Sequence, residues 1–201
     1  MTEIVDLYSN PALIIWDMQY GMATRALNYN EIVGQIRKLI DTSHSLKIPV
    51  VYSQLTGLPY EFMNDYIIYW AKKRGMDPKI PRTIEGNRDW QILDELAPSS
   101  GDIVLKKHTA SFFVGTYLEY LLRIRNVKSL ILTGVSTEVG IETTARHASC
   151  LGFIPLIAED AIGSSNKDLH SNSLQVMRGM FELQTTDSII QKIKNGQEFK
   201  T

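Results

Sequence analysis

Cysteine is the residue type that this sequence most nearly lacks. Cys150 is the single cysteine among 201 residues, so the chain can form no internal disulfide. A secretion signal begins with a basic stretch that is followed by an apolar one. The first residues, MTEIVDLYSNP, do not show this pattern. Because disulfides are typical of secreted proteins and rare in reducing compartments, we expect a cytoplasmic protein.

Long hydrophobic runs and an excess of charge of one sign are also missing. Apolar runs such as PALIIW and LILTGV are far shorter than the roughly 20 residues that a membrane-spanning helix needs. The formal net charge at pH 7 is -1, which gives no electrostatic reason to bind a polyanion. We therefore expect neither a nucleic acid nor a membrane as a partner.

Histidine is scarce, and its spacing does not match that of metal ligands. The four histidines, His44, His108, His147 and His170, are scattered along the chain. Metal sites built from histidine usually place two of the ligands a few residues apart. The sequence therefore predicts no metal site, and we expect no cofactor.

Short apolar runs alternate with segments of helical periodicity. Hydrophobic residues make up 44% of the chain and charged residues 21%, which is typical of a globular protein, and we predict one domain over residues 1–201. Unbroken apolar runs favour strands covered on both faces, and their alternation with helices favours parallel pairing. The sequence predicts an α/β fold, a Rossmann-like three-layer αβα domain with a mostly parallel six-stranded sheet. The predicted strands are ALIIWD ending at Asp17, IPVVYSQ ending at Gln54, DIVLK ending near Lys106, KSLILTG ending at Gly134, FIPLIAED ending at Asp160 and FELQTT near Phe181.

The region from Thr56 to Leu96 does not follow this alternation. It contains an aromatic stretch, YEFMNDYIIYW, and a basic cluster, KKRG. We interpret it as loops or short helices inserted between the second and third strands. A segment that covers the substrate is the alternative interpretation.

Polar residues follow three of the predicted strands. Asp17 follows the first strand, Lys106 and Lys107 end the third, and GVSTEVG follows the fourth. Ligands of open parallel sheets bind outside the carboxyl ends of the strands, so a carboxylate, an ammonium and a helix N-terminus are expected at one edge. A carboxylate and an ammonium in this arrangement favour proton transfer near neutral pH. The alternative is an ordinary loop carboxylate and a surface lysine.

Three motifs in this order resemble the isochorismatase-like hydrolase superfamily, also called the cysteine hydrolase family. They are ALIIWDMQ, KHTASFF and GVSTEVGIETTARHASCLGFIPLIAEDAIGS, and the resemblance runs from about Ala12 to Ile190. It implies a hydrolase of a small-molecule substrate and a homo-oligomer. It also implies that Asp17 is the catalytic aspartate, that Lys107 is the catalytic lysine, and that a cis peptide bond joins Val135 to Ser136.

The resemblance further implies a binding and oxyanion region formed by Val135, Ser136, Val139 and Gly140. Gln19, His108 and Glu138 are further candidates for the same pocket. Glu138 stands in the first helical turn, where a carboxylate either stabilises the helix dipole or activates a water molecule. Ser136 and Thr137 are interpreted as caps, since no histidine base is evident beside either hydroxyl.

Gly140 is where the sequence departs from the family. Amidase members have the nucleophilic cysteine at this position, and a glycine excludes a thioester there. Cys150 is ten residues further on, about 15 Å along a helix, and is expected to be a small core residue. Some isochorismatases also lack the cysteine, and their aspartate protonates an enol ether. We therefore expect a hydrolase without a cysteine nucleophile, with Asp17 as general acid/base and Lys107 as electrostatic stabiliser. The alternative is a pseudoenzyme that keeps the pocket as a binding or assembly module.

Overall fold

The computed structural model describes residues 6–80 and 83–198, and within them the sheet is six-stranded and entirely parallel. The strand order β3-β2-β1-β4-β5-β6 places β1 and β4 at the centre. This confirms the predicted α/β fold, and each strand overlaps its predicted run. The strands are β1 (Pro11–Trp16), β2 (Val50–Leu55), β3 (Ile103–Lys107), β4 (Ser129–Val135), β5 (Ile154–Gly163) and β6 (Glu182–Gln184).

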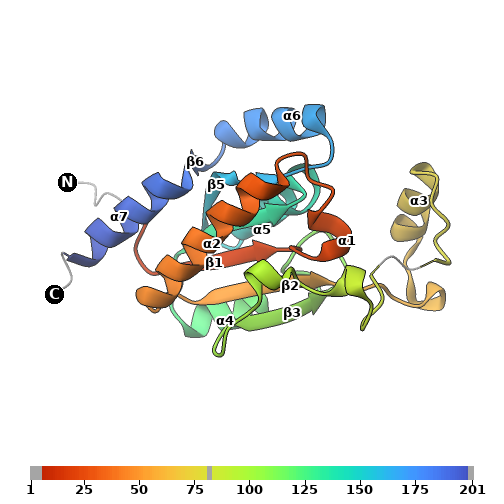
Figure 1. Cartoon of the computed structure of the whole chain (residues 1–201), viewed down its shortest axis with the longest axis horizontal. Helices are drawn as coiled ribbons and strands as arrows, with labels where there is room; N and C mark the ends of the chain where they lie inside the picture. The colour runs from red at the N-terminus through yellow and green to blue at the C-terminus, as the bar shows by residue number, and fades with distance from the viewer. Residues whose placement is uncertain (1–5, 81–82, 199–201) are drawn as a thin grey trace.

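Helices cover both faces of the sheet and complete three layers (Figure 1). The buried residues of α2 and α7 pack on one face, and those of α4, α5 and α6 pack on the other. A π-helical turn, Thr137–Ile141, leads from β4 into α5. The helices are α1 (Tyr20–Ala23), α2 (Tyr29–Ser45), α3 (Asp65–Lys73), α4 (Leu118–Ile124), α5 (Glu142–Cys150), α6 (Lys167–Arg178) and α7 (Thr186–Glu198).

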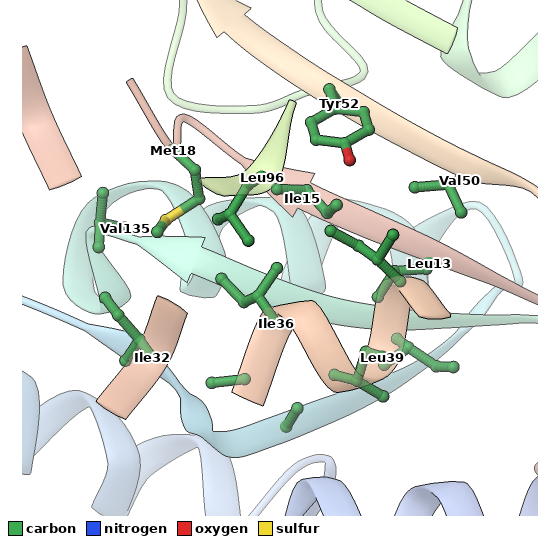
Figure 2. Close-up of a cluster of buried hydrophobic side chains, with 14 of the residues drawn as sticks. Leu13, Ile15, Met18, Ile32, Ile36, Leu39, Val50, Tyr52, Leu96 and Val135 are labelled. Atoms are coloured by element: carbon green, nitrogen blue, oxygen red, sulfur yellow. The ribbon is translucent and has the colours of Figure 1, made fainter. Parts of the chain in front are cut away.

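Strand β1 is buried along its whole length, as its unbroken apolar run predicts. Side chains alternate between the faces of a strand, so Leu13 and Ile15 join the core beneath α2. Figure 2 shows these two side chains beside Ile36 of α2. Ile14 and Trp16 face the opposite way and belong to the core under α4 and α5. This alternation places the Trp16 indole on the α5 side, directly before Asp17.

The insertion between β2 and β3 consists of short helices and loops, as predicted. It contains α3 and three 3-10 turns, Tyr60–Phe62, Arg88–Trp90 and Asp94–Leu96. Figure 1 shows α3 apart from the helices that cover the sheet. Tyr66 and Tyr69 are exposed. The aromatic stretch therefore does not form part of the core.

Among residues 6–80 and 83–198, no helix is both long and apolar enough to cross a membrane. The expectation that no secretion signal is present concerns, in part, residues 1–5, which lie outside the described residues.

Candidate active site

The carboxyl ends of β1 and β3 bring Asp17 and Lys107 together. Lys107 is the last residue of β3, and Asp17 is the first residue after β1. The ammonium Nζ of Lys107 lies 2.8 Å from Oδ2 of Asp17, and neither side chain is exposed to solvent. Asp17 has a left-handed backbone, with φ of 47°, a conformation that aspartate tolerates better than most residues. The two residues therefore form a buried ion pair at the edge where parallel sheets bind ligands.

Two further groups complete the hydrogen bonding of this pair. The hydroxyl of Ser53 in β2 donates to Oδ1 of Asp17 at 2.5 Å. The Lys107 ammonium also donates to the backbone carbonyl of Thr109 at 3.1 Å. Both carboxylate oxygens of Asp17 thus have a donor, which is the condition for keeping a charge buried.

Burial is the main influence on the protonation of the pair. It raises the pKa of Asp17, and the attraction of the nearby Lys107 ammonium opposes that shift. Burial likewise lowers the pKa of Lys107, against the attraction of the Asp17 carboxylate. The charged and neutral forms of the pair are therefore closer in free energy than in water, which suits a group that gives and takes a proton.

The indole of Trp16 covers the Lys107 ammonium. Nζ lies 3.5 Å from the centre of the Trp16 ring, well within the range of a cation–π interaction. The ring Nε1 donates to the hydroxyl of Thr144 in α5 at 3.0 Å. Only 2% of Trp16 is exposed, so the indole lies between the ion pair and α5 without reaching the surface.

Gly140 lies in the π-helical turn and packs directly against that indole. A Cβ atom placed on Gly140 would meet Cη2, Cζ2 and Cζ3 of Trp16 at well under 3.0 Å, a separation that real Cβ atoms essentially never show. The structure thus has room for the indole only because residue 140 has no side chain.

Backbone N–H groups of the π-helical turn are already hydrogen-bonded. The N–H groups of Gly140 and Val139 donate to the carbonyl of Ser136 at 2.9 and 3.3 Å. Both N–H groups thus have an acceptor within the turn, and their role in stabilising developing negative charge stays a prediction.

The peptide bond between Val135 and Ser136 is cis, as the resemblance implied. Val135 is the buried last residue of β4, and the Ser136 hydroxyl makes no capping hydrogen bond to the turn that follows. The expected cap at Ser136 is therefore not formed.

Gln19 and His108 make contacts with the backbone around the pair. The buried Gln19 amide donates to the carbonyls of Leu55 and Trp90 and accepts from the N–H of Leu55. His108 Nδ1 lies 2.7 Å from the carbonyl of Thr56. Gln19 thus links the residues after β1 to β2 and to the insertion, and His108 links the residues after β3 to the start of the insertion. Both N–H donors of the Gln19 amide are used by these contacts.

Glu138 belongs to a second polar cluster beside the turn. The hydroxyl of Ser164 donates to its Oε1 at 3.0 Å, while its buried Oε2 has no hydrogen-bond partner among the described residues. His170 Nδ1 lies 2.8 Å from the Thr137 hydroxyl, so the expectation that no histidine stands beside that hydroxyl is wrong. Thr137 is fully buried and its hydroxyl also donates to the carbonyl of Gly163, which does not suit a nucleophile.

Cys150 is exposed at the end of α5, so the expectation of a core residue is wrong. Within residues 6–80 and 83–198, no group of three His, Cys, Asp or Glu side chains is arranged to hold a metal ion. A hollow of about 560 Å³ lies at the opposite edge of the sheet, lined by Val50 and Ile103 among others, and is not part of the site around Asp17.

Sequence reasoning missed Trp16 and Ser53. Trp16 stands in the motif IIWD, where an aromatic residue closes an otherwise aliphatic strand, and this is the signal that marks it. Its partner Gly140 is distant along the chain, so the packing of the indole on Gly140 could not be predicted from sequence spacing. Ser53 had no signal beyond its place near the end of a buried strand.

Residues 11–188 match the isochorismatase domain family. The chain belongs to this family. Among curated relatives, the isochorismatase family protein YecD of Escherichia coli O157:H7 is 32% identical over 166 residues, which are 81% of this chain and 85% of that protein. Ureidoacrylate amidohydrolase RutB of Cronobacter sakazakii is 43% identical over 77 residues, which are 38% of this chain and 33% of the relative.

Two solved structures of hydrolytic enzymes share the fold. A cysteine hydrolase from Pseudomonas syringae pv. phaseolicola superposes with a TM-score of 0.81 at 24% identity, covering 96% of this chain and 95% of that one. N-carbamoylsarcosine amidase from Thermoplasma acidophilum has a TM-score of 0.74 at 26% identity, covering 89% and 97%. The fold of this chain is thus similar to those of both proteins over nearly its whole length.

Proposed function

We propose that this isochorismatase family protein hydrolyses a small molecule without a thiol nucleophile. The observation that carries the proposal is the buried contact of 2.8 Å between Asp17 and Lys107. In this proposal the Asp17 carboxylate takes a proton from the attacking water at Oδ2 and gives it to the leaving group of the substrate. The Lys107 ammonium stabilises the carboxylate before the proton arrives and after it leaves.

The absence of a side chain at Gly140 supports the thiol-free part of this proposal. A thioester at residue 140 is chemically impossible, and the exposed Cys150 stands at the far end of α5. In this proposal water attacks the substrate directly. The free Oε2 of Glu138 supports a role for this carboxylate in orienting that water, since it is an acceptor with no protein partner among the described residues.

Relatives suggest the class of substrate. RutB acts on ureidoacrylate by its name, and the T. acidophilum neighbour is an N-carbamoylsarcosine amidase. Both names describe a small acid that carries a ureido group. We accordingly propose a small amide, ureido or enol-ether compound as the substrate.

A second candidate function is a binding or assembly module without catalysis. The complete burial of Asp17 and Lys107 favours it, because a sealed and fully hydrogen-bonded ion pair is also what a purely structural pair looks like. Turnover separates the two functions, since only a hydrolase transfers a proton between Asp17 and a substrate.

A screen of small amides, ureas, carboxylates and enol ethers tests the proposal. Each compound is assayed for turnover and for binding with the native chain, Asp17→Asn and Asp41→Asn. Asp41 is an exposed carboxylate of α2 paired with Arg37, and serves as the matched control. We expect turnover that survives Asp41→Asn and is lost in Asp17→Asn. Binding without turnover by any compound would instead establish the second function.

Homo-oligomeric assembly and a cytoplasmic location stay predictions. The exposed aromatics of the insertion, among them Phe62, Tyr66 and Tyr69, support assembly because large exposed apolar groups often mark an interface. Light scattering on the purified chain measures the assembly directly, and a monomeric mass at high concentration would contradict it.

A further inference from the structure

A serine and a histidine meet on the α5 side of the molecule. Ser111 lies in the segment between β3 and α4, and His147 lies in α5. The hydroxyl Oγ of Ser111 is 2.7 Å from Nδ1 of His147. A hydroxyl within hydrogen-bond distance of an imidazole is the arrangement in which a histidine base activates a serine nucleophile. The pair is therefore a candidate for chemistry of its own, separate from that of Asp17 and Lys107.

The hydrogen bonds around Ser111 place its hydroxyl proton toward His147. The backbone N–H of Phe113 donates to Ser111 Oγ at 3.3 Å, so the hydroxyl oxygen already serves as an acceptor. In the part of the chain that the structure describes, His147 Nδ1 is the acceptor within hydrogen-bond distance of the single hydroxyl proton. On this assignment Ser111 donates and Nδ1 accepts. This direction allows the imidazole to take the proton as the oxygen attacks a substrate.

The imidazole is oriented by packing, and the pair lies close to the surface. The ring of Phe113 packs against that of His147, with 5.1 Å between the ring centres and an angle of 50° between the ring planes. His147 is partly exposed. Ser111 keeps 6% of its surface exposed, and Val114 in the same loop is 46% exposed. A small dissolved compound thus has a short approach to the pair, beside the apolar ring of Phe113.

Other hydrogen bonds already fix the segment that carries Ser111. The N–H of Phe112 donates to the hydroxyl of Thr144 in α5 at 3.2 Å, which ties the segment to the helix. The hydroxyl of Thr116 donates to the carbonyl of Phe112 at 2.6 Å. These two bonds do not depend on the side chains at positions 111 and 147. The contact between Ser111 and His147 is therefore available for a role other than anchoring.

We propose that Ser111 and His147 form a second reactive site, which hydrolyses small carboxylic esters through an acyl group on Ser111. Oγ bonds to the ester carbonyl carbon while Nδ1 of His147 takes the hydroxyl proton. The bond from that carbon to the alcohol oxygen then breaks, and His147 gives the proton to the leaving alcohol. Water repeats the sequence on the acyl group and releases the acid. This activity is independent of the proposed function, because it uses neither Asp17 nor Lys107.

A fluorophosphonate reagent tests the site directly, because its phosphorus takes the place of the ester carbonyl carbon. Ser111 Oγ displaces fluoride, and tandem mass spectrometry locates the stable phosphonyl adduct. Ser149 is an internal reference, since it is an exposed serine of α5 whose hydroxyl donates to the carbonyl of Arg146. In the native chain we expect an adduct on Ser111 and none on Ser149.

Variants of His147 separate catalysis from packing. His147→Gln can keep a hydrogen bond but is no base, so we expect it to slow the labelling of Ser111 by about 10²-fold or more, the usual contribution of a general base. Added imidazole should restore part of the labelling in His147→Ala, which a purely structural histidine would not allow. Cys150→Ser, at the end of the same helix, is the control and should label as the native chain does.

Three results would overturn the inference. One is a native chain in which Ser111 labels no faster than Ser149, because the serine would then be an ordinary hydroxyl. Another is a folded His147→Gln chain that labels Ser111 at the native rate. The third concerns turnover of 4-nitrophenyl acetate, which we expect to be faster in the native chain than in Ser111→Ala. Equal rates in these two chains would show that no acyl group passes through Ser111.

Discussion

The Trp16 indole occupies the place in which a side chain on Gly140 would begin. Trp16 is the last residue of the central strand β1, and Gly140 lies in the π-helical turn that precedes α5. Their contact therefore joins the middle of the sheet to the start of α5. The indole takes up volume that any side chain at position 140 would require. The glycine at this position is therefore part of the packing of this chain.

A side chain at position 140 should strongly destabilise the fold. We expect Gly140→Ala to lower the free energy of unfolding by about 3 kcal/mol or more, because overpacking a rigid interior displaces neighbouring groups. Urea unfolding measures the change. Gly34→Ala in α2 is the matched control, since nothing lies within 4 Å of its Cβ position, and it should raise the free energy of unfolding by up to about 1 kcal/mol.

The stability effects of Trp16 and Gly140 should be coupled. If the clash is the cause, Trp16→Leu combined with Gly140→Ala should lose less stability than the two single changes added together. Strictly additive losses would show that the indole and residue 140 do not compete for one space.

Removing Lys107 alone should leave an uncompensated buried carboxylate. We expect Lys107→Met to lower the free energy of unfolding by about 3–5 kcal/mol at neutral pH. Adding Asp17→Asn to Lys107→Met should restore much of that loss, because no charge then stays buried. Denaturant unfolding of the two single variants and the double variant measures the coupling. Equal stability of Lys107→Met with and without Asp17→Asn would contradict the account.

The sign of the pH dependence provides a second measurement on Lys107→Met. Burial raises the pKa of Asp17 above its usual 3.8, and loss of the neighbouring ammonium removes the main opposing influence. The folded state then holds a proton that the unfolded state releases, so stability should increase as pH falls from neutral toward 3.8. A chain that loses stability over that range more steeply than its double variant would contradict this assignment.

His170 should contribute the opposite pH dependence. Burial lowers its pKa from the usual 6.5, and the charge of Glu138 opposes the shift. As pH falls below 6.5, the unfolded state takes up a proton before the folded state does, so stability is lost until the folded-state pKa is passed. The free energy of unfolding, measured from neutral pH to about pH 5, should therefore decrease less steeply in His170→Gln than in the native chain. Identical slopes would show that His170 does not titrate differently in the two states.

The fold was predictable because its signal is local. Each buried strand is a short unbroken run such as ALIIWD or KSLILTG, and two covered faces require that pattern whatever the function is. The β5 strand continues to Gly163, past its predicted end at Asp160, because its pairing with β4 resumes after an irregularity in register. Such a tertiary effect leaves little trace in a local pattern.

The candidate site was predictable only where strand ends define it. Asp17 and Lys107 meet because one follows a parallel strand and the other ends one, and parallel strands end at one edge of the sheet. The Trp16 indole and the engaged N–H groups of the turn could not be inferred, since they depend on side-chain packing and on a π-helical geometry. Cys150 was placed wrongly because a small apolar residue near a helix end fits either face.

The most direct test of the thiol-free mechanism compares three chains on a substrate found by the screen. The measurement is kcat for the native chain, for Cys150→Ser and for Asp17→Asn. We predict that Cys150→Ser keeps the native kcat, and that Asp17→Asn lowers it by about 10²–10⁴-fold, the usual contribution of a general acid or base. Loss of turnover in Cys150→Ser, or native turnover in Asp17→Asn, would contradict the account.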